Sequence, residues 1–248
     1  MNFRDATILI TGGNSGIGRG LAEALADLGA KIIITGRDKD RLDDVVQANP
    51  GMSAYELDVT SSLGINTFAA QVTTEHPELN AVIHNAGILA YESVLGGYDM
   101  ETVEKVVLTN LIAPIGLTSA LLPHLRAMPE AAIVTVSSGL AFVPLASASA
   151  YSASKAGMHS WSQSLRHELR STNISVVEIA PPLVATELTP GQSRNPHAMP
   201  LDAFIEEAVG LLCADVTPEE VIVQRAIPQR TAERAGQFKK VFDLINPN

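Results

Sequence analysis

The feature that most constrains this chain is an alternation of two kinds of segment. Short apolar runs rich in β-branched residues are separated by longer stretches with helical spacing of apolar positions. The runs are continuously apolar, which is typical of parallel strands covered by helices on both faces. The predicted strands are residues 6–11, 31–36, 53–57, 80–84, 131–137, 174–180 and 221–227.

The intervening stretches at residues 18–28, 101–122, 151–170 and 201–214 are predicted to be helices. Strand–helix alternation of this kind predicts a doubly wound α/β sheet. Such sheets bind ligands beyond the carboxyl ends of their strands. The sequence shows no linker-like shift in composition, so we expect one domain over residues 1–248.

Composition limits the partners and the compartment. The net charge of −10 argues against nucleic acid or an anionic membrane surface as a partner, because both require a positive surface. Cys213 is the single cysteine, so a reducing, cytoplasmic location is expected, with Cys213 a buried packing residue. We expect no signal peptide, and no stretch approaching the ~18 apolar residues of a membrane span.

A glycine-rich turn directly follows the first predicted strand and opens a predicted helix. Glycine allows a tight turn and close approach of the backbone to a ligand. Free N–H groups and the positive end of a helix favour a pyrophosphate. The alternative is an ordinary strand–helix turn. The candidate phosphate-binding residues are Gly12, Asn14, Ser15, Gly16, Ile17 and Gly18.

The end of the second strand, at Gly36 and Arg37, is where a dinucleotide fold selects its cofactor. An acidic residue there would bind the ribose hydroxyls of NAD and repel a 2′-phosphate. Arg37 instead offers a guanidinium that can bind a phosphate through two hydrogen bonds. We therefore expect NADP(H) in preference to NAD(H). The alternative is that Arg37 is a solvated residue at the start of a charged helix.

A proton-transfer group is predicted at Tyr151 and Lys155. The two residues share a helix face at i and i+4, and a nearby ammonium lowers the pKa of a phenol. Ser138 follows the fifth predicted strand, where its hydroxyl can bond a substrate carbonyl oxygen. Asn110 is an unexpected amide in an apolar helix; the alternative is that it bonds neighbouring backbone. The five histidines other than His84 show no zinc-ligand spacing, so no metal is expected; they are His76, His124, His159, His167 and His197.

Together these motifs resemble the short-chain dehydrogenase/reductase family in order and spacing, from residue 6 to about residue 186. The resemblance implies a Rossmann-like, mostly seven-stranded parallel sheet and reversible hydride transfer between a nicotinamide and a small carbonyl or secondary alcohol. It implies that Tyr151 is the acid/base, that Lys155 lowers its pKa and holds the ribose, and that Ser138 orients the carbonyl. Asn110 would anchor a proton-conducting water. Further implied cofactor contacts are Asp58, Val59, Asn85, Ala86, Gly87, Pro181, Val184 and Thr186.

The chain departs from the family pattern at two positions. His84 stands where a second asparagine is usual, and Pro182 replaces the glycine that normally follows Pro181. Proline fixes φ and lacks an N–H, so the backbone toward Thr186 is expected to run differently. This variant resembles a subset of bacterial oxidoreductases without an assigned substrate. Residues 187–214 are expected to form the substrate loop and helix.

Other functions remain open at this level. The chain is alternatively a dinucleotide-binding sensor or scaffold without turnover, an NAD-dependent dehydrogenase, or a family member with different chemistry such as enoyl reduction or epimerisation. A homodimer or homotetramer is expected from the resemblance. No residue pattern identifies the substrate.

Overall fold

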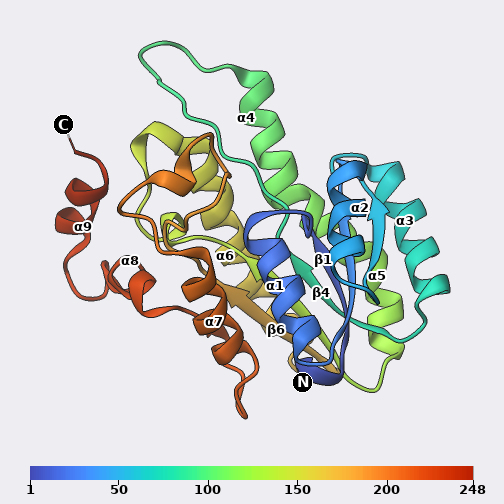
Figure 1. Cartoon of the computed structure of the whole chain (residues 1–248). Coiled ribbons are helices and arrows are strands. Elements are labelled where there is room, and N and C mark those ends of the chain that lie inside the picture. The colour runs from blue at the N-terminus through green and yellow to red at the C-terminus, as the bar shows by residue number, and fades with distance from the viewer. Residues whose placement is uncertain (248) are drawn as a thin grey trace.

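The computed structural model describes residues 1–247. Across these residues, seven parallel strands form one sheet in the order β3-β2-β1-β4-β5-β6-β7 (Figure 1). The order reverses beside β1, which makes the β1–β4 edge a topological switch point. The strands are β1 (Thr7–Thr11), β2 (Lys31–Gly36), β3 (Ser53–Glu56), β4 (Leu79–His84), β5 (Ala131–Val136), β6 (Ile174–Ile179) and β7 (Glu220–Val221).

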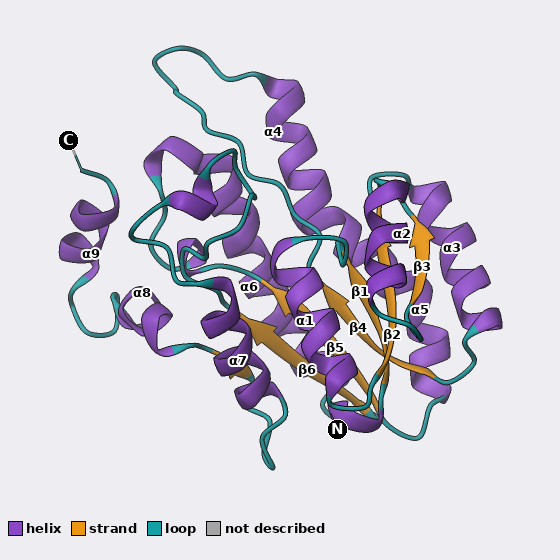
Figure 2. Cartoon of the chain, in the orientation of Figure 1, coloured by secondary structure: helices purple, strands orange, loops and turns teal. Residues whose placement is uncertain are grey.

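Helices cover both faces of the sheet, as Figure 2 shows. They are α1 (Gly16–Asp27), α2 (Lys39–Ala48), α3 (Ser62–Glu75), α4 (Met100–Val107), α5 (Ala113–Ala127), α6 (Ser149–Leu169), α7 (Leu201–Leu212), α8 (Ile227–Thr231) and α9 (Phe238–Ile245). One core contains residues of α1, α2 and α7, and the other contains residues of α3, α5 and α6.

The period of the strands divides the apolar side chains between these two cores. Ile8 and Ile10 of β1 face the α1 side, whereas Leu9 faces the α3 side. All three are fully buried. Each such burial contributes about 1.5–3 kcal/mol. This two-sided burial explains why the strand sequences are continuously apolar.

The strand predictions hold within a residue or two for the first six strands, and the fold class is confirmed. The last strand is different: β7 contains only Glu220 and Val221, and residues 224–226 form a 3₁₀ turn that leads into α8. The predicted strand 221–227 is therefore wrong beyond its start. Pro228 lies in the first turn of α8, where its missing N–H is tolerated. Cys213 caps the end of α7 and is only half-buried, and burial raises the pKa of its thiol.

The long helical segment Met100–Ala127 combines α4, a π-helical turn η2 (Leu108–Ile112) and α5. It is long and apolar enough to span a membrane, so the expectation that no stretch approaches such a length is wrong. Its polar residues near the turn are uncharged, which keeps its mean hydropathy high. Length and composition alone are weak evidence for a membrane span, because the core helices of globular proteins share them. In this segment, Leu117, Leu121 and Leu125 are buried in the core beneath α3.

Candidate active site

The glycine turn between β1 and α1 has the backbone of an anion-binding site. Gly12 and Gly16 have φ of +66° and +52°, in the left-handed region that favours glycine. Ser15 caps α1 but makes no side-chain hydrogen bond to it, which leaves the first N–H groups of the helix to other acceptors. A Cβ on Gly18 would lie 2.3 Å from the Gly12 carbonyl oxygen. Gly18 therefore lets α1 pack closely against the turn, and the free N–H groups at the start of the helix can bind an anion.

Side chains at the end of β4 hold this turn in place. Asn85 donates from Nδ2 to the carbonyl oxygens of Thr11 and Gly12, at 3.0 and 3.2 Å. Thr11 Oγ1 accepts the N–H groups of Asn85 and Ala86, both at 3.1 Å. Two predicted cofactor contacts, Asn85 and Ala86, thus lie at the carboxyl end of β4 and are hydrogen-bonded to the end of β1, at the switch point. Ile17, in the first turn of α1, packs against the core.

The end of β2 is shaped by Asn14. A Cβ on Gly36 would lie 2.8 Å from Asn14 Nδ2, so a side chain at position 36 is not accommodated without movement. Arg37 is exposed beside this point. The pKa of Asp58 is lowered by two hydrogen bonds from Thr60 and, to a lesser degree, by the charge of Arg37. Two predicted contacts, Arg37 and Asp58, therefore lie in one neighbourhood; Val59 follows and packs toward the α3 side.

The predicted catalytic side chains converge above β5. Ser138 caps a short 3₁₀ turn after β5, while Tyr151 and Lys155 lie in the first two turns of α6. Lys155 Nζ donates to the Val136 carbonyl oxygen at 2.7 Å and lies 5.7 Å from the centroid of the Tyr151 ring. All three side chains are buried. A phenol, a hydroxyl and an ammonium thus meet at one strand end.

Burial dominates the acid–base properties of this group. It raises the pKa of Tyr151 to about 12, and the nearby Ser138 hydroxyl acts in the opposite direction. Burial also lowers the pKa of Lys155 to about 8, against the opposing charge of Glu178. The lowering of the Tyr151 pKa by Lys155 therefore stays a prediction.

Asn110 lies in the π-helical turn η2, a feature that often marks functional sites. Its Oδ1 accepts the Ile88 N–H at 2.9 Å, and its Nδ2 donates to the Ile88 carbonyl and to Ser154 Oγ at 2.9 and 3.1 Å. A Cβ on Gly87 would lie 3.3 Å from Asn110 Oδ1 and 3.5 Å from Lys155 Nζ. Asn110 thus ties the loop after β4 to the catalytic helix.

The segment after β6 passes over the glycine turn despite its two prolines. The Pro181 carbonyl accepts the Gly139 N–H at 2.8 Å, next to Ser138. Val184 is buried and forms a parallel bridge with Met199, which closes the intervening loop. A Cβ on Gly16 would lie 3.4 Å from Thr186 Cγ2. Thr186 therefore faces the glycine turn.

His84, which takes the place of the usual asparagine, is buried. Its Nε2 lies 2.7 Å from Thr118 Oγ1, and the side chain is fully buried. Burial lowers its pKa to about 3, so the imidazole is neutral near neutrality. It acts as a structural hydrogen-bonding residue beneath the switch point.

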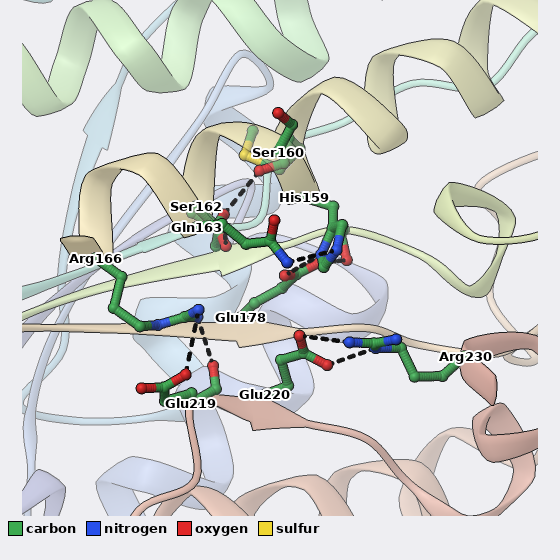
Figure 3. A network of polar contacts seen from close by, with 12 residues as sticks. His159, Ser160, Ser162, Gln163, Arg166, Glu178, Glu219, Glu220 and Arg230 are labelled. Atoms are coloured by element: carbon green, nitrogen blue, oxygen red, sulfur yellow. Dashed lines mark hydrogen bonds and ion pairs between the residues drawn. The ribbon is translucent and has the colours of Figure 1, made fainter. Parts of the chain in front are cut away.

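The structure shows a polar cluster that the sequence did not predict (Figure 3). His159, Glu178 and Glu220 have ligand-type atoms within 4.8 Å of one another. Glu220, however, is bonded to Arg230 at 2.5 and 2.9 Å, and Glu178 is bonded to Ser137 and His159. The oxygens of both carboxylates are thus already used in hydrogen bonds within the protein. The available signal was a carboxylate inside a strand predicted to be buried on both faces, which requires a partner.

The arrangement fits a dinucleotide. The glycine-rich turn at the start of α1 suits the pyrophosphate, and the Ser138–Tyr151–Lys155 group suits proton transfer beside it. The model of the short chain dehydrogenase family matches residues 6–197, which contain all of these groups.

The chain belongs to this family.

Individual relatives agree with the assignment. The chain is 36% identical to "Uncharacterized oxidoreductase DltE" of Bacillus subtilis, over 99% of this chain and 98% of that one. Its fold resembles that of a short chain dehydrogenase from Burkholderia cenocepacia in complex with NADP, with a TM-score of 0.82, 24% identity and complete coverage of both chains. A short chain dehydrogenase from Shigella flexneri complexed with NADP matches with a TM-score of 0.77 and 25% identity, covering 89% of this chain and 95% of that one. This short-chain dehydrogenase is thus an oxidoreductase with a single-domain, all-parallel Rossmann-like fold.

Proposed function

We propose that this oxidoreductase uses NADP(H) to interconvert a carbonyl and a secondary alcohol on a small molecule. The observation that carries the proposal is the convergence of Ser138, Tyr151 and Lys155 above β5, beside the glycine turn. The bound nicotinamide would supply hydride transfer to or from the substrate carbon. We identify no metal requirement in the proposed chemistry.

Each side chain has a role that its surroundings support. Ser138 would donate a hydrogen bond to the substrate oxygen and orient it. Tyr151, buried at 7% exposure, would give a proton to that oxygen in reduction and take it back in oxidation. Lys155 would stabilise the phenolate and hold the ribose. Asn110, bonded to Ile88 and Ser154, would anchor a water that passes protons toward solvent.

The proposed preference for NADP(H) rests on the end of β2. Gly36 places no acidic side chain at the end of β2, and Arg37 is exposed beside it. A guanidinium there can form charge-assisted hydrogen bonds with a 2′-phosphate, each worth about 1.5–3 kcal/mol. One such bond corresponds to an affinity difference of roughly tenfold to a hundredfold.

The test is fluorescence titration of the protein with NADPH and NADH, in the wild type and in Arg37→Ala. We expect tighter NADPH binding in the wild type and a loss of about tenfold to a hundredfold in the variant. NADH affinity should not change. Arg41→Ala is the matched control, because Arg41 is an exposed arginine of α2 that is paired with Asp38.

Equal affinities for the two cofactors, unaffected by Arg37→Ala, would refute the preference for NADP(H). Binding of neither cofactor would favour a fold member without turnover. With binding established, a carbonyl panel assayed with NADPH then tests the reaction. The candidates for substrate selection in that panel are residues 187–214, which follow Thr186.

Two further expectations accompany this proposal: a cytoplasmic location and a homodimer or homotetramer. The location is inferred from the single thiol, at Cys213. The oligomer is inferred from the family resemblance, with support from Ile112, which is 49% exposed on the long helix. Light scattering of the purified protein tests the second expectation.

A further inference from the structure

Glu178 is a fully buried carboxylate in β6, beneath the helix that carries Tyr151 and Lys155. Its exposed fraction is 0%. It pairs in register with Thr135, and the next pair is Val136 with Ile179. The Val136 carbonyl is the acceptor for Lys155 Nζ. Glu178 therefore lies one step along the sheet from the backbone group that holds the lysine.

Both oxygens of Glu178 are occupied by donors. Ser137 Oγ donates to Oε1 at 2.5 Å. His159 Nδ1 lies 2.7 Å from Oε2 (Figure 3). An ionised carboxylate only accepts hydrogen bonds, so the imidazole carries its proton on Nδ1. His159 Nε2 then accepts from Gln163 Nε2 at 3.1 Å. Hydrogen bonds to the charged form stabilise that form, and a buried carboxylate without them is costly.

Lys155 is the complementary group. Its side chain is 4% exposed, and this burial disfavours the charged ammonium form. Burial lowers the pKa of Lys155, and Glu178 is the group that acts in the opposite direction. A buried ammonium without an opposing charge loses its proton near neutrality. Glu178, in the strand that pairs with β5, is therefore the candidate counter-charge for this lysine.

The other charges around Glu178 have partners of their own. From β7, Glu220 is bonded to Arg230 of α8 through both oxygens. From α6, Arg166 donates to the carbonyl oxygens of Val176 and Glu219. His159, also on α6, faces Glu178 and supplies a hydrogen bond to its Oε2. Glu178 also helps to raise the pKa of Arg230, but the first partner of that arginine is Glu220. At Lys155, Glu178 is the charge that favours the protonated form.

We propose that Glu178 is a positioning residue of the reaction: a buried carboxylate that serves as the counter-charge of Lys155 and is held in place by Ser137 and His159. The catalytic consequence rests on the proposed function, whereas the charge pairing does not. Loss of the carboxylate would leave the ammonium unmatched and deprotonate it at a lower pH. Tyr151 would then lack the cation that stabilises its phenolate.

Glu178→Gln tests the pairing directly, because glutamine keeps the size of the side chain and an acceptor for Ser137 while removing the charge. The first readout is the titration of Lys155 Nζ by NMR of lysine-labelled protein without cofactor, assigned with Lys155→Met. We expect the midpoint to fall by about one pH unit or more, the usual effect of losing a nearby opposite charge. Glu219→Gln, which alters a 77%-exposed carboxylate nearby, is the matched control and should not shift it.

The second readout is the pH profile of carbonyl reduction. Its alkaline limb should move toward acid by the same amount in Glu178→Gln, with little change in NADPH affinity. Glu178→Asp restores the charge and should return both midpoints most of the way to the wild-type values. A purely structural residue would lower turnover at every pH without moving the limb.

An unchanged Lys155 midpoint in folded Glu178→Gln overturns the proposal, and so do equal shifts in the glutamine and aspartate variants. Should Glu178→Gln not fold, His159→Gln replaces it, with a smaller shift expected in the same direction and its absence counting against the proposal. A Lys155 shift without any carbonyl turnover would refute the proposed function while supporting the charge pairing. Turnover with no shift would do the reverse.

Discussion

His84 makes folding of this protein sensitive to acid, and the size of the effect follows from its burial. The pKa of the imidazole falls from 6.5 to about 3 because the ring is fully buried. A proton therefore binds the unfolded chain below pH 6.5 but binds the folded chain only near pH 3. Stability is complete above pH 6.5 and is lost as the pH falls toward 3. The difference corresponds to about 5 kcal/mol at the acid end.

That loss is a large share of the roughly 5–15 kcal/mol that stabilises an ordinary domain. We expect His84→Gln to remove the dependence, because the amide Nε2 can reach Thr118 as the imidazole Nε2 does. The assay is urea unfolding at several pH values between 7 and 4. The stability difference between wild type and variant should change by about 1.4 kcal/mol per pH unit below pH 6.

The control for this experiment is His167→Gln, which alters an exposed histidine of α6 and should follow the wild type. Parallel loss of stability in the wild type and in His84→Gln would refute the reasoning. It would mean that the folded protein admits a proton, or water, to His84 at no cost.

The remaining predictions concern the site itself. Tyr151→Phe should reduce carbonyl turnover by about 10²–10⁴-fold while leaving NADPH affinity within a fewfold, measured by steady-state assay and titration; retained turnover would contradict the acid/base role. Gly18→Ala should weaken NADPH binding and lower stability by about 1–3 kcal/mol, because the added Cβ would lie 2.3 Å from Asn85 Nδ2 and from the Gly12 carbonyl. Gly210→Ala is its control: a Cβ there meets nothing within 4 Å, so thermal unfolding should show no loss.

The sequence predicts the local features of this fold well, because they follow from short-range patterns. Continuously apolar runs give the buried strands, and the glycine turn gives the left-handed backbone at Gly12 and Gly16. The spacing of Tyr151 and Lys155 gives their shared helix face. The short β7 was not predicted, since apolar β-branched residues after Val221 fit a strand equally well.

Contacts between distant segments were not accessible in the same way. Asn246 accepts the Ala146 N–H at 2.6 Å and donates to the Pro144 carbonyl at 3.0 Å, across about a hundred residues. A Cβ on Gly139 would lie 2.3 Å from Gln229 Oε1, so α8 also packs beside Ser138. No periodicity in the sequence signals such pairings. The contacts of Glu178 with Ser137 and His159 also required the three-dimensional structure. The sequence showed only that a carboxylate stands in an otherwise apolar strand.

The central position of β1 has a consequence for how the chain folds. On one edge, β1 pairs with β2, which is close in sequence, as the pair Thr7–Lys31 shows. On the other edge, β1 pairs with β4, which is farther along the chain, as the pair Thr7–Leu79 shows. Closing that longer loop costs more entropy, and non-local pairing slows folding. The β1–β2–β3 half can therefore form early, while the half that carries Tyr151 and Lys155 condenses onto its exposed edge. Because the β1–β4 pairing comes late, mutations at that edge should speed unfolding more than they slow refolding.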